Sequence, residues 1–243
     1  MIPRVSIVVT AYNEGEEIVA HLERLLEAVM LPCEVIVVCD SSDDSSIRFV
    51  EKVMSNDPRI SVVINEFGRG PARAIRYGFS CASAPVVVVT MADGCDDPYQ
   101  IDQLARLVER GVVIAAASRY ARGGQAIGAP FLKGLMSKMA GVSLKILANV
   151  GTWDATNSFK AYSKAFVEEV GIESDAGFEV GLELVAKARR MRKPVAEIPT
   201  IWLERTGGES KFRVLEWLPR YMKWYFHAFG RDSEKIKNGR NGG

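Results

Sequence analysis

The sequence lacks a long hydrophobic run and carries almost no net charge. No stretch of about 18 uncharged apolar residues occurs, so we expect no transmembrane helix. The formal net charge of +1 creates no global field that would attract nucleic acid, so no nucleic-acid partner is expected. The N-terminus enters a strand-like run at once and has no signal-peptide layout, which predicts a cytoplasmic protein.

Cysteine is scarce, and its spacing matches no metal-binding motif. No Cys-x-x-Cys spacing occurs, and three of the four cysteines fall in or beside apolar runs. We therefore interpret them as buried free thiols rather than as a metal site or disulfides. They are Cys33, Cys39, Cys81 and Cys95.

Two patterns alternate in the first half of the chain. Short apolar runs occur at 5–9, 34–38, 60–64, 86–90 and 112–116, and helical patterns lie between them at roughly 14–29, 45–54, 71–81 and 98–110. Strand, helix and strand at this spacing predict an α/β fold with a mostly parallel central sheet and helices on both faces. The alternation ends after Arg119. We expect a loop, a patterned stretch over 131–148, strands at 158–162 and 196–203, a helix at 179–190 and an aromatic helix over 214–229.

The four-valine run at 86–89 leads into acidic residues. A short β-branched run predicts a buried parallel strand, and open α/β folds bind ligands just past the carboxyl ends of such strands. Asp93, Asp96 and Asp97 follow there, so a divalent cation held with a phosphate-bearing substrate would balance their charge. The alternative is a solvated turn in which Asp97 and Pro98 begin the next helix.

Polar residues also follow the first and second strands. Tyr12 offers a ring to stack, Asn13 offers an amide, and Glu14 and Asp40 offer carboxylates at one sheet edge, which suits a nucleoside. The alternative is a pair of helix-capping turns. After the third strand, the segment 68–70 (Gly-Arg-Gly) opens a helix, an arrangement that favours phosphate but is equally compatible with a plain turn.

Six motifs occur in order along the chain. They are Thr10-Ala11-Tyr12-Asn13-Glu14, Cys39-Asp40-Ser41-Ser42, Gly68-Arg69-Gly70, Ala117-Ser118-Arg119-Tyr120, Asp154-Ala155-Thr156-Asn157-Ser158-Phe159-Lys160 and Arg205-Thr206-Gly207-Gly208-Glu209-Ser210-Lys211. The chain thereby resembles the family-2 inverting glycosyltransferases, and within them the dolichol- and polyprenyl-phosphate glycosyltransferases. The resemblance implies a nucleotide-diphosphate-sugar transferase (GT-A type) fold. We expect a catalytic domain over 1–211, a C-terminal amphipathic aromatic helix over 212–230 and a disordered tail over 231–243.

The resemblance also implies a reaction. A sugar would pass from a nucleotide-diphosphate sugar to a polyprenyl phosphate by single displacement with inversion, assisted by Mg²⁺ or Mn²⁺. Met91 stands where the family has the first acid of its metal motif, so the cation would rely on Asp93 and on Asp96 or Asp97. The implied nucleotide-binding residues are Thr10, Ala11, Tyr12, Asn13, Glu14, Asp40, Ser42, Gly68, Arg69, Gly70, Ala92 and Asp93. The implied catalytic residues are Asp93, Arg119, Lys133, Ser137 and Arg205.

The implied acceptor needs cationic donors rather than a base. A phosphomonoester has a second pKa near 6, so a lipid phosphate is already a nucleophile at pH 7. Lys133 and Ser137 occupy the place of the family's Arg-x-x-x-Ser pair, although lysine loses the bidentate geometry of arginine. The other acceptor-phosphate candidates are Lys160, Arg205, Ser210 and Lys211.

Two segments combine apolar or aromatic residues with interspersed cations. They cover 131–150 and 214–229, and this composition suits a membrane interface. We therefore expect peripheral attachment to the cytosolic face of a membrane, with an accessory membrane protein or a homo-oligomer as a further partner. The alternative is that the aromatic stripe docks on the catalytic domain or on a second subunit.

Two other functions stay open from the sequence. A family-2 transferase that acts on a glycan or another hydroxyl acceptor would need a base, for which Asp154 and Glu179 are the strong candidates. A catalytically silent nucleotide-sugar binding protein is motivated by Met91. The retained Asp93 and Arg119 argue against it.

Overall fold

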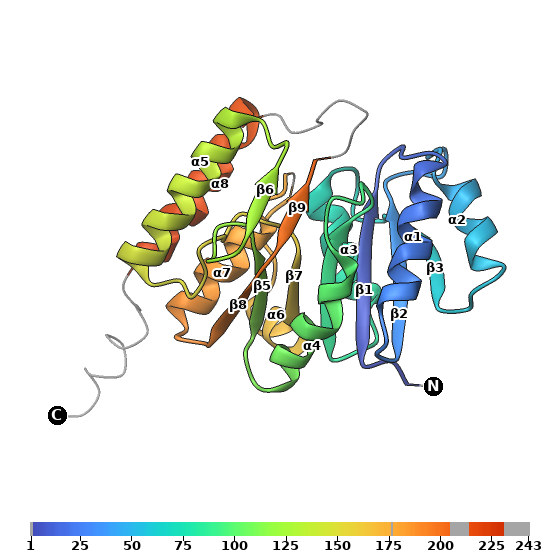
Figure 1. Cartoon of the computed structure of the whole chain (residues 1–243), viewed down its shortest axis with the longest axis horizontal. Coiled ribbons are helices and arrows are strands. Elements are labelled where there is room, and N and C mark those ends of the chain that lie inside the picture. Colours follow the sequence, from blue (N-terminus) through green and yellow to red (C-terminus); the bar gives the residue numbers. More distant parts are fainter. Residues whose placement is uncertain (1, 176, 205–213, 231–243) are drawn as a thin grey trace.

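The computed structural model describes residues 2–175, 177–204 and 214–230, with the backbone alone at 131–133 and 214–217. A seven-stranded sheet crosses the molecule in the order β3-β2-β1-β4-β7-β5-β8 (Figure 1). β7 is antiparallel to both of its neighbours, and the other pairs are parallel, which confirms the predicted mostly parallel sheet. The strands are β1 Val5–Ala11, β2 Cys33–Cys39, β3 Ile60–Ile64, β4 Val86–Met91, β5 Ile114–Ser118, β7 Lys160–Ser163 and β8 Val195–Pro199.

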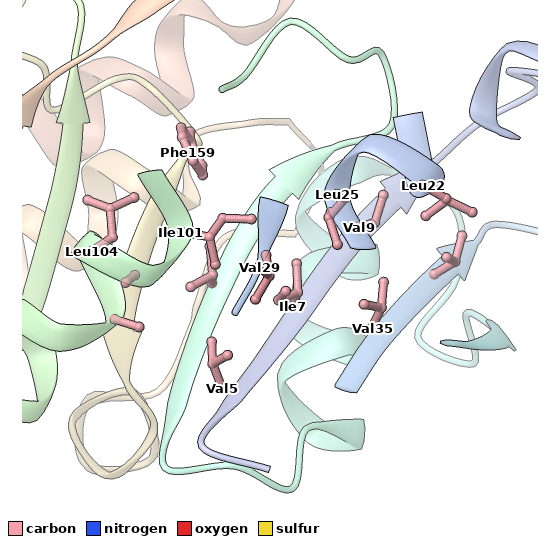
Figure 2. Packing of buried hydrophobic residues seen from close by; sticks show 14 of the residues in the cluster. Val5, Ile7, Val9, Leu22, Leu25, Val29, Val35, Ile101, Leu104 and Phe159 are labelled. Atoms are coloured by element: carbon pink, nitrogen blue, oxygen red, sulfur yellow. The ribbon is translucent and has the colours of Figure 1, made fainter. Parts of the chain in front are cut away.

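Alternating side chains build a hydrophobic core on each face of this sheet. In β1, Val5, Ile7 and Val9 belong to one core and Val8 to the other, because successive side chains of a strand point to opposite faces. Figure 2 shows the first core, where Leu25 of a covering helix packs near the β1 side chains. The first face is covered by α1 Glu17–Ala28, α2 Ile47–Met54 and α4 Ile101–Glu109, which a short turn, η1 Pro98–Gln100, precedes. The second is covered by α3 Pro71–Cys81, α6 Lys164–Val170 and α7 Val180–Arg190.

The chain after β5 departs from the strand–helix alternation. β6 Gln125–Ile127 pairs in parallel with β9 Ile201–Leu203 as a separate two-stranded ribbon. The single strand predicted over 196–203 is therefore divided between two sheets. Thr200 lies at the division, where its backbone N–H donates to the Ser118 carbonyl of β5 (3.0 Å).

Two helical segments form one end of the molecule (Figure 1). α5 Phe131–Ser143 continues into a π-helical turn, η2 Leu144–Ala148, and α8 Val214–Phe229 packs against this turn and α7. Trp224 of α8 is buried and donates its Nε1 to Ser174 Oγ (3.1 Å), and Tyr225 donates its hydroxyl to Ser143 Oγ (2.9 Å). Part of the aromatic stripe thus docks on the main body of the chain. None of the helices among the described residues is both long and apolar enough to span a membrane.

Candidate active site

A cavity of about 670 Å³ opens at the carboxyl edge of the sheet. This volume and this place are typical of ligand sites in open α/β folds. The inner faces of α5 and α8 form its far wall. Its lining from the strand ends and the loops after them includes Thr10, Ala11, Tyr12, Glu14, Asp40, Arg69, Gly70, Ala92, Asp93, Asp96 and Arg119.

One carboxylate organises the side of the cavity next to β2. Asp40 accepts hydrogen bonds from the backbone N–H of Gly70 (2.9 Å) and from Asn65 Nδ2 (3.0 Å). Asn65 also donates to the Gly68 carbonyl (2.7 Å). Gly70 has a φ of 123°, a conformation that favours glycine. Asp40 thereby fixes the glycine loop so that Arg69 and Gly70 face the cavity.

Three predicted nucleotide-binding residues do not line the cavity, namely Asn13, Ser42 and Gly68. Asn13 instead joins two loops, because its backbone N–H donates to Asp44 Oδ2 (3.0 Å) and its Oδ1 accepts from the Ser45 N–H (3.2 Å). Gly68 contributes through its carbonyl contact with the loop. A direct binding role for these three residues stays a prediction.

Asp93 and Asp96 lie together just past β4. Asp96 is 6% exposed and accepts a hydrogen bond from Thr90 Oγ1 (2.8 Å). Burial, and then the negative charge of Asp93, raise the pKa of Asp96 to about 7. Two carboxylates in this environment repel each other when both are ionised. A divalent cation bound between them would relieve that repulsion, and carboxylate oxygens are the donors that Mg²⁺ and Mn²⁺ prefer.

Asp97 is engaged elsewhere. Its Oδ1 accepts from the Tyr99 N–H (3.2 Å), which caps the short helix η1, and it lies 3.6 Å from Arg24 Nη2. Between the two alternatives for the second acid, the structure therefore favours Asp96. No cluster of three or more His, Cys, Asp or Glu side chains is placed to hold a metal in the described part of the chain. The cation would take its other ligands from phosphate and water.

Arg119 is a fixed positive charge in the cavity wall. Its Nε and Nη2 donate to Asp154 Oδ2 (2.7 Å) and Oδ1 (2.9 Å), and Nη2 also donates to Ser137 Oγ (3.2 Å). Ser137 Oγ lies 2.6 Å from Thr156 Oγ1. Burial disfavours both charges, but the attraction between them prevails, so the pKa of Arg119 is raised and that of Asp154 is lowered. Arg119, Ser137 and Thr156 all line the cavity.

Lys160 does not reach the cavity. Its side chain is fully buried, and its Nζ donates to the carbonyls of Ala155 (3.2 Å) and Asn157. Burial lowers the pKa of Lys160 to about 7, against the opposing effect of Asp154. Lys160 thus stabilises the loop that carries Thr156. The sequence analysis had predicted instead that Lys160 binds the acceptor phosphate. For the other acceptor candidates, Lys133 lies on α5 with its side chain undescribed, and Arg205, Ser210 and Lys211 lie outside the described residues.

The family model "Glycosyl transferase family 2" matches residues 6–171, well over half of the chain. The chain belongs to glycosyl transferase family 2. It is 32% identical over 232 residues to a dolichol-phosphate mannosyltransferase of Pyrococcus furiosus, covering 91% of this chain and 64% of that protein. It is also 27% identical over 230 residues to a polyprenol monophosphomannose synthase of Mycolicibacterium smegmatis, covering 88% of this chain and 86% of that protein. This family-2 chain thus spans just under two thirds of the length of its Pyrococcus relative.

Solved structures share the fold. A glucosyl-3-phosphoglycerate synthase of Mycobacterium tuberculosis, in complex with Mn²⁺, uridine diphosphate and phosphoglyceric acid, superimposes with a TM-score of 0.69 at 16% identity, over 94% of this chain and 79% of that one. A mannosyltransferase of Pyrobaculum calidifontis, in complex with GDP-Man and Mn²⁺, gives a TM-score of 0.61 at 20% identity, over 100% of this chain and 66% of that one. At these identities the likeness establishes the fold, which is the GT-A type expected from the sequence.

The sequence did not reveal the parts of this family-2 site that come from α7, β9 and α8 and from the residues beside them. The aromatic and apolar residues of these parts recur at helical spacing, a pattern that also describes an ordinary core. One available signal was the position of Trp202 and Glu204, which alternate with Ile201 and Leu203 directly before the motif at 205–211. The missed lining residues include Phe178, Leu182, Trp202, Glu204, Leu218, Tyr221, Met222 and Tyr225.

Proposed function

We propose that this family-2 chain transfers a sugar from a nucleotide-diphosphate sugar to a polyprenyl phosphate, by single displacement with inversion at the anomeric carbon. Support comes from relatives named for dolichol- and polyprenol-phosphate mannosyl transfer and from a cavity that has two chemically different ends. One end is built by strand-end loops that carry carboxylates. The other is bounded by a fixed arginine and two helices.

The donor would bind along the strand ends. Tyr12 and Asp40 suit the nucleoside, and the N-terminus of α3 with Arg69 suits phosphate, because helix N-termini and guanidinium groups attract anions. Asp93 and Asp96 would hold Mg²⁺ or Mn²⁺, which when bound would neutralise negative charge on the leaving diphosphate. These residues would also orient the sugar, because a bound diphosphate fixes where the sugar attached to it lies.

The single observation that carries the acceptor assignment is the Arg119–Asp154 pair. A hydroxyl acceptor would need a base, but neither candidate, Asp154 or Glu179, lines the cavity. Both carboxylate oxygens of Asp154 accept hydrogen bonds from Arg119, which lowers the pKa of Asp154 and makes it a weaker base. A phosphate acceptor instead needs fixed positive donors. Arg119, with the Ser137 hydroxyl 3.2 Å from its Nη2, supplies such a donor group on the α5 side.

The outer face of α5 suits a membrane surface. The inner face, with Ser137, lines the cavity, whereas the outer face is apolar and exposed and lies beside Lys138. The apolar side chains of this face, which continues onto η2, are, with their exposed fractions, Leu135 (43%) and Met139 (64%) on α5 and Ile146 (64%) and Leu147 (70%) on η2. We propose that this face contacts the cytosolic leaflet, so that a lipid phosphate reaches Arg119 from the bilayer. Each nearby lysine would add on the order of 1 kcal/mol of attraction to anionic lipid.

Two matched variants test this surface. Met139→Glu should abolish sedimentation with anionic vesicles at low salt, because it places a negative charge in the apolar face. Met30→Glu makes the same chemical change at another exposed methionine (80% exposed), two residues after the end of α1, and should leave sedimentation unchanged. Failure of the wild-type protein to sediment, or equal effects of the two variants, would refute the membrane contact.

A matched pair of acceptors tests the proposed reaction. Release of nucleoside diphosphate from GDP-mannose or UDP-glucose, in the presence of Mn²⁺ or Mg²⁺, should increase on addition of polyprenyl phosphate. It should not increase with the corresponding polyprenol, which has the same chain but no phosphate. Stimulation by the alcohol or by soluble glycans alone would favour the hydroxyl-acceptor function. Nucleotide-sugar binding without turnover for any acceptor would favour a silent binding protein.

A further inference from the structure

β9 and the residue directly after it present two side chains of complementary chemistry to the cavity. Successive side chains of a strand point to opposite sides. Trp202 and the next-but-one residue, Glu204, both line the cavity, whereas Ile201 and Leu203 are about half exposed (47% and 51%) and do not line it. None of the motifs that carry the family resemblance includes Trp202 or Glu204.

Backbone contacts place these side chains beside the acidic loop. The Leu203 N–H donates to the carbonyl of Cys95, the residue directly before Asp96 (3.2 Å). Trp202 and Glu204 therefore lie on either side of Leu203, which is hydrogen-bonded to the loop that carries Asp93 and Asp96. The neighbouring ribbon strand holds this position, because the Glu204 N–H donates to the Ile127 carbonyl (2.9 Å).

The ribbon leaves little freedom at Glu204. A Cβ added at Gly128, directly after β6, would lie 2.9 Å from the Cβ of Glu204, so only glycine fits that approach. Before β9, Gln100 Nε2 donates to the carbonyl of Pro199, the last residue of β8 (2.8 Å), and the Gln125 N–H donates to the Thr200 carbonyl (2.9 Å). The two cavity side chains thus start from a backbone that is fixed at both ends of β9, as a specificity site requires.

An aromatic ring beside a carboxylate is suited to a sugar. The C–H face of a pyranose packs on an aromatic ring, and a carboxylate accepts hydrogen bonds from two neighbouring hydroxyls. We infer that Trp202 and Glu204 form the subsite for the hexosyl group of the donor, with Trp202 against one face of the ring and Glu204 on its hydroxyls. This inference rests on the proposed function, since a diphosphate held at Asp93 and Asp96 places its sugar within reach of β9.

The test compares donors with and without the sugar. Binding of GDP and GDP-mannose, and of UDP and UDP-glucose, is measured by calorimetry with Mn²⁺ for the wild type, Glu204→Gln, Trp202→Leu and the control Ile201→Ala. Glu204→Gln and Trp202→Leu should each weaken binding of the nucleotide sugar about tenfold or more, because hydrogen bonds to a charged group and buried aromatic area are lost. Binding of the free nucleoside diphosphate should not change. Ile201→Ala should change neither the binding of the nucleotide sugar nor that of the free nucleoside diphosphate.

Other outcomes overturn the inference in distinguishable ways. If the variants weakened binding of the nucleoside diphosphate and of the nucleotide sugar equally, Trp202 and Glu204 would contact the nucleotide or only stabilise the fold. If they changed binding of neither, the two residues would not belong to the donor site. A fall in kcat alone, with donor binding intact, would assign Glu204 to the chemical step instead. A wild-type protein that binds none of the four probes would refute the proposed function itself. If both variants kept the wild-type difference in affinity between nucleotide sugar and free nucleoside diphosphate, only the subsite would be refuted.

Discussion

The buried Arg119–Asp154 pair should be among the most sensitive points of the molecule. The Asp154 side chain is 0% exposed and that of Arg119 is 15% exposed. Two side-chain hydrogen bonds of 2.7 and 2.9 Å join them, and the Arg119 backbone N–H donates a third to Asp154 Oδ2 (3.0 Å). Asp154→Asn keeps the size of the side chain but turns an amide N–H₂ toward guanidinium N–H groups, leaving the buried cation without its counter-charge. Removal of one partner from a buried pair lowers stability by about 3–5 kcal/mol. We expect a loss of this size in urea unfolding at pH 7.

A partly exposed pair provides the control. Arg59 donates to Asp57 with nearly the same bidentate geometry, at 3.0 and 2.7 Å, but its side chain is 37% exposed and that of Asp57 is 22% exposed. Asp57→Asn should therefore lower the unfolding free energy by less than about 1 kcal/mol. If the Asp154 and Asp57 variants were equally destabilised, the structural reasoning about burial at Arg119 would be refuted.

The same pair sets a pH dependence. Because Arg119 holds the pKa of Asp154 below its usual value, the stabilisation is present above the unfolded pKa near 3.9 and is lost as the pH falls through the lower folded pKa. The difference in stability between the wild type and Asp154→Asn should therefore narrow only in the acid range. A difference that narrowed between pH 5 and 7 would contradict an ionised, paired Asp154.

Three further outcomes follow from the structure. Gly141→Ala should lower the unfolding free energy by about 1–3 kcal/mol in urea titration, because its Cβ would overlap the Trp153 carbonyl oxygen, whereas Gly134→Ala, with only the Ala129 Cβ at 4.0 Å, should be nearly neutral. Asp96→Asn should raise the unfolding free energy of the cation-free protein, relative to the wild type, by an amount that grows from pH 4 to 7. Burial raises the pKa of Asp96 to about 7, so the folded state opposes ionisation of Asp96 across that range. A difference in unfolding free energy between the two proteins that stayed constant from pH 4 to 7 would contradict this. Asp93→Asn should abolish cation-dependent binding of nucleotide sugar in calorimetry and Met91→Asp should strengthen it, so normal turnover of the Asp93 variant in chelator would refute a role in cation binding.

The sequence predicted the first half of the fold closely, because β1, β2, β4 and β5 are buried on both faces and read as continuous apolar runs. Continuous β-branched runs and amphipathic helices gave β3 and α3 their observed bounds and placed β1, β2, β4 and β5 to within about two residues. The direction of β7 and its place between β4 and β5 have no local signal, since they depend on pairing between distant segments. The division at Thr200 was missed for the same reason.

The site was predicted where it depends on strand ends and missed where it depends on packing between distant elements. The loops with Tyr12, Asp40 and Asp93 follow parallel strands, so their meeting at one edge could be inferred. Lys160 was placed on the acceptor because of its charge, and nothing in the sequence indicates that its ammonium group is enclosed by backbone carbonyls. The wall from β9 and α8 likewise depends on which faces those elements turn inward.

The central claim is that the acceptor is a lipid phosphate, and the product tests it most directly. The protein is incubated with GDP-mannose or UDP-glucose, Mn²⁺ and polyprenyl phosphate in vesicles, and the lipid fraction is analysed by mass spectrometry and for anomeric configuration. We expect a lipid whose mass has increased by one hexose joined through its phosphate, with inverted configuration, and none with Asp93→Asn. Sugar transferred to a hydroxyl acceptor while polyprenyl phosphate stays unmodified would contradict the assignment.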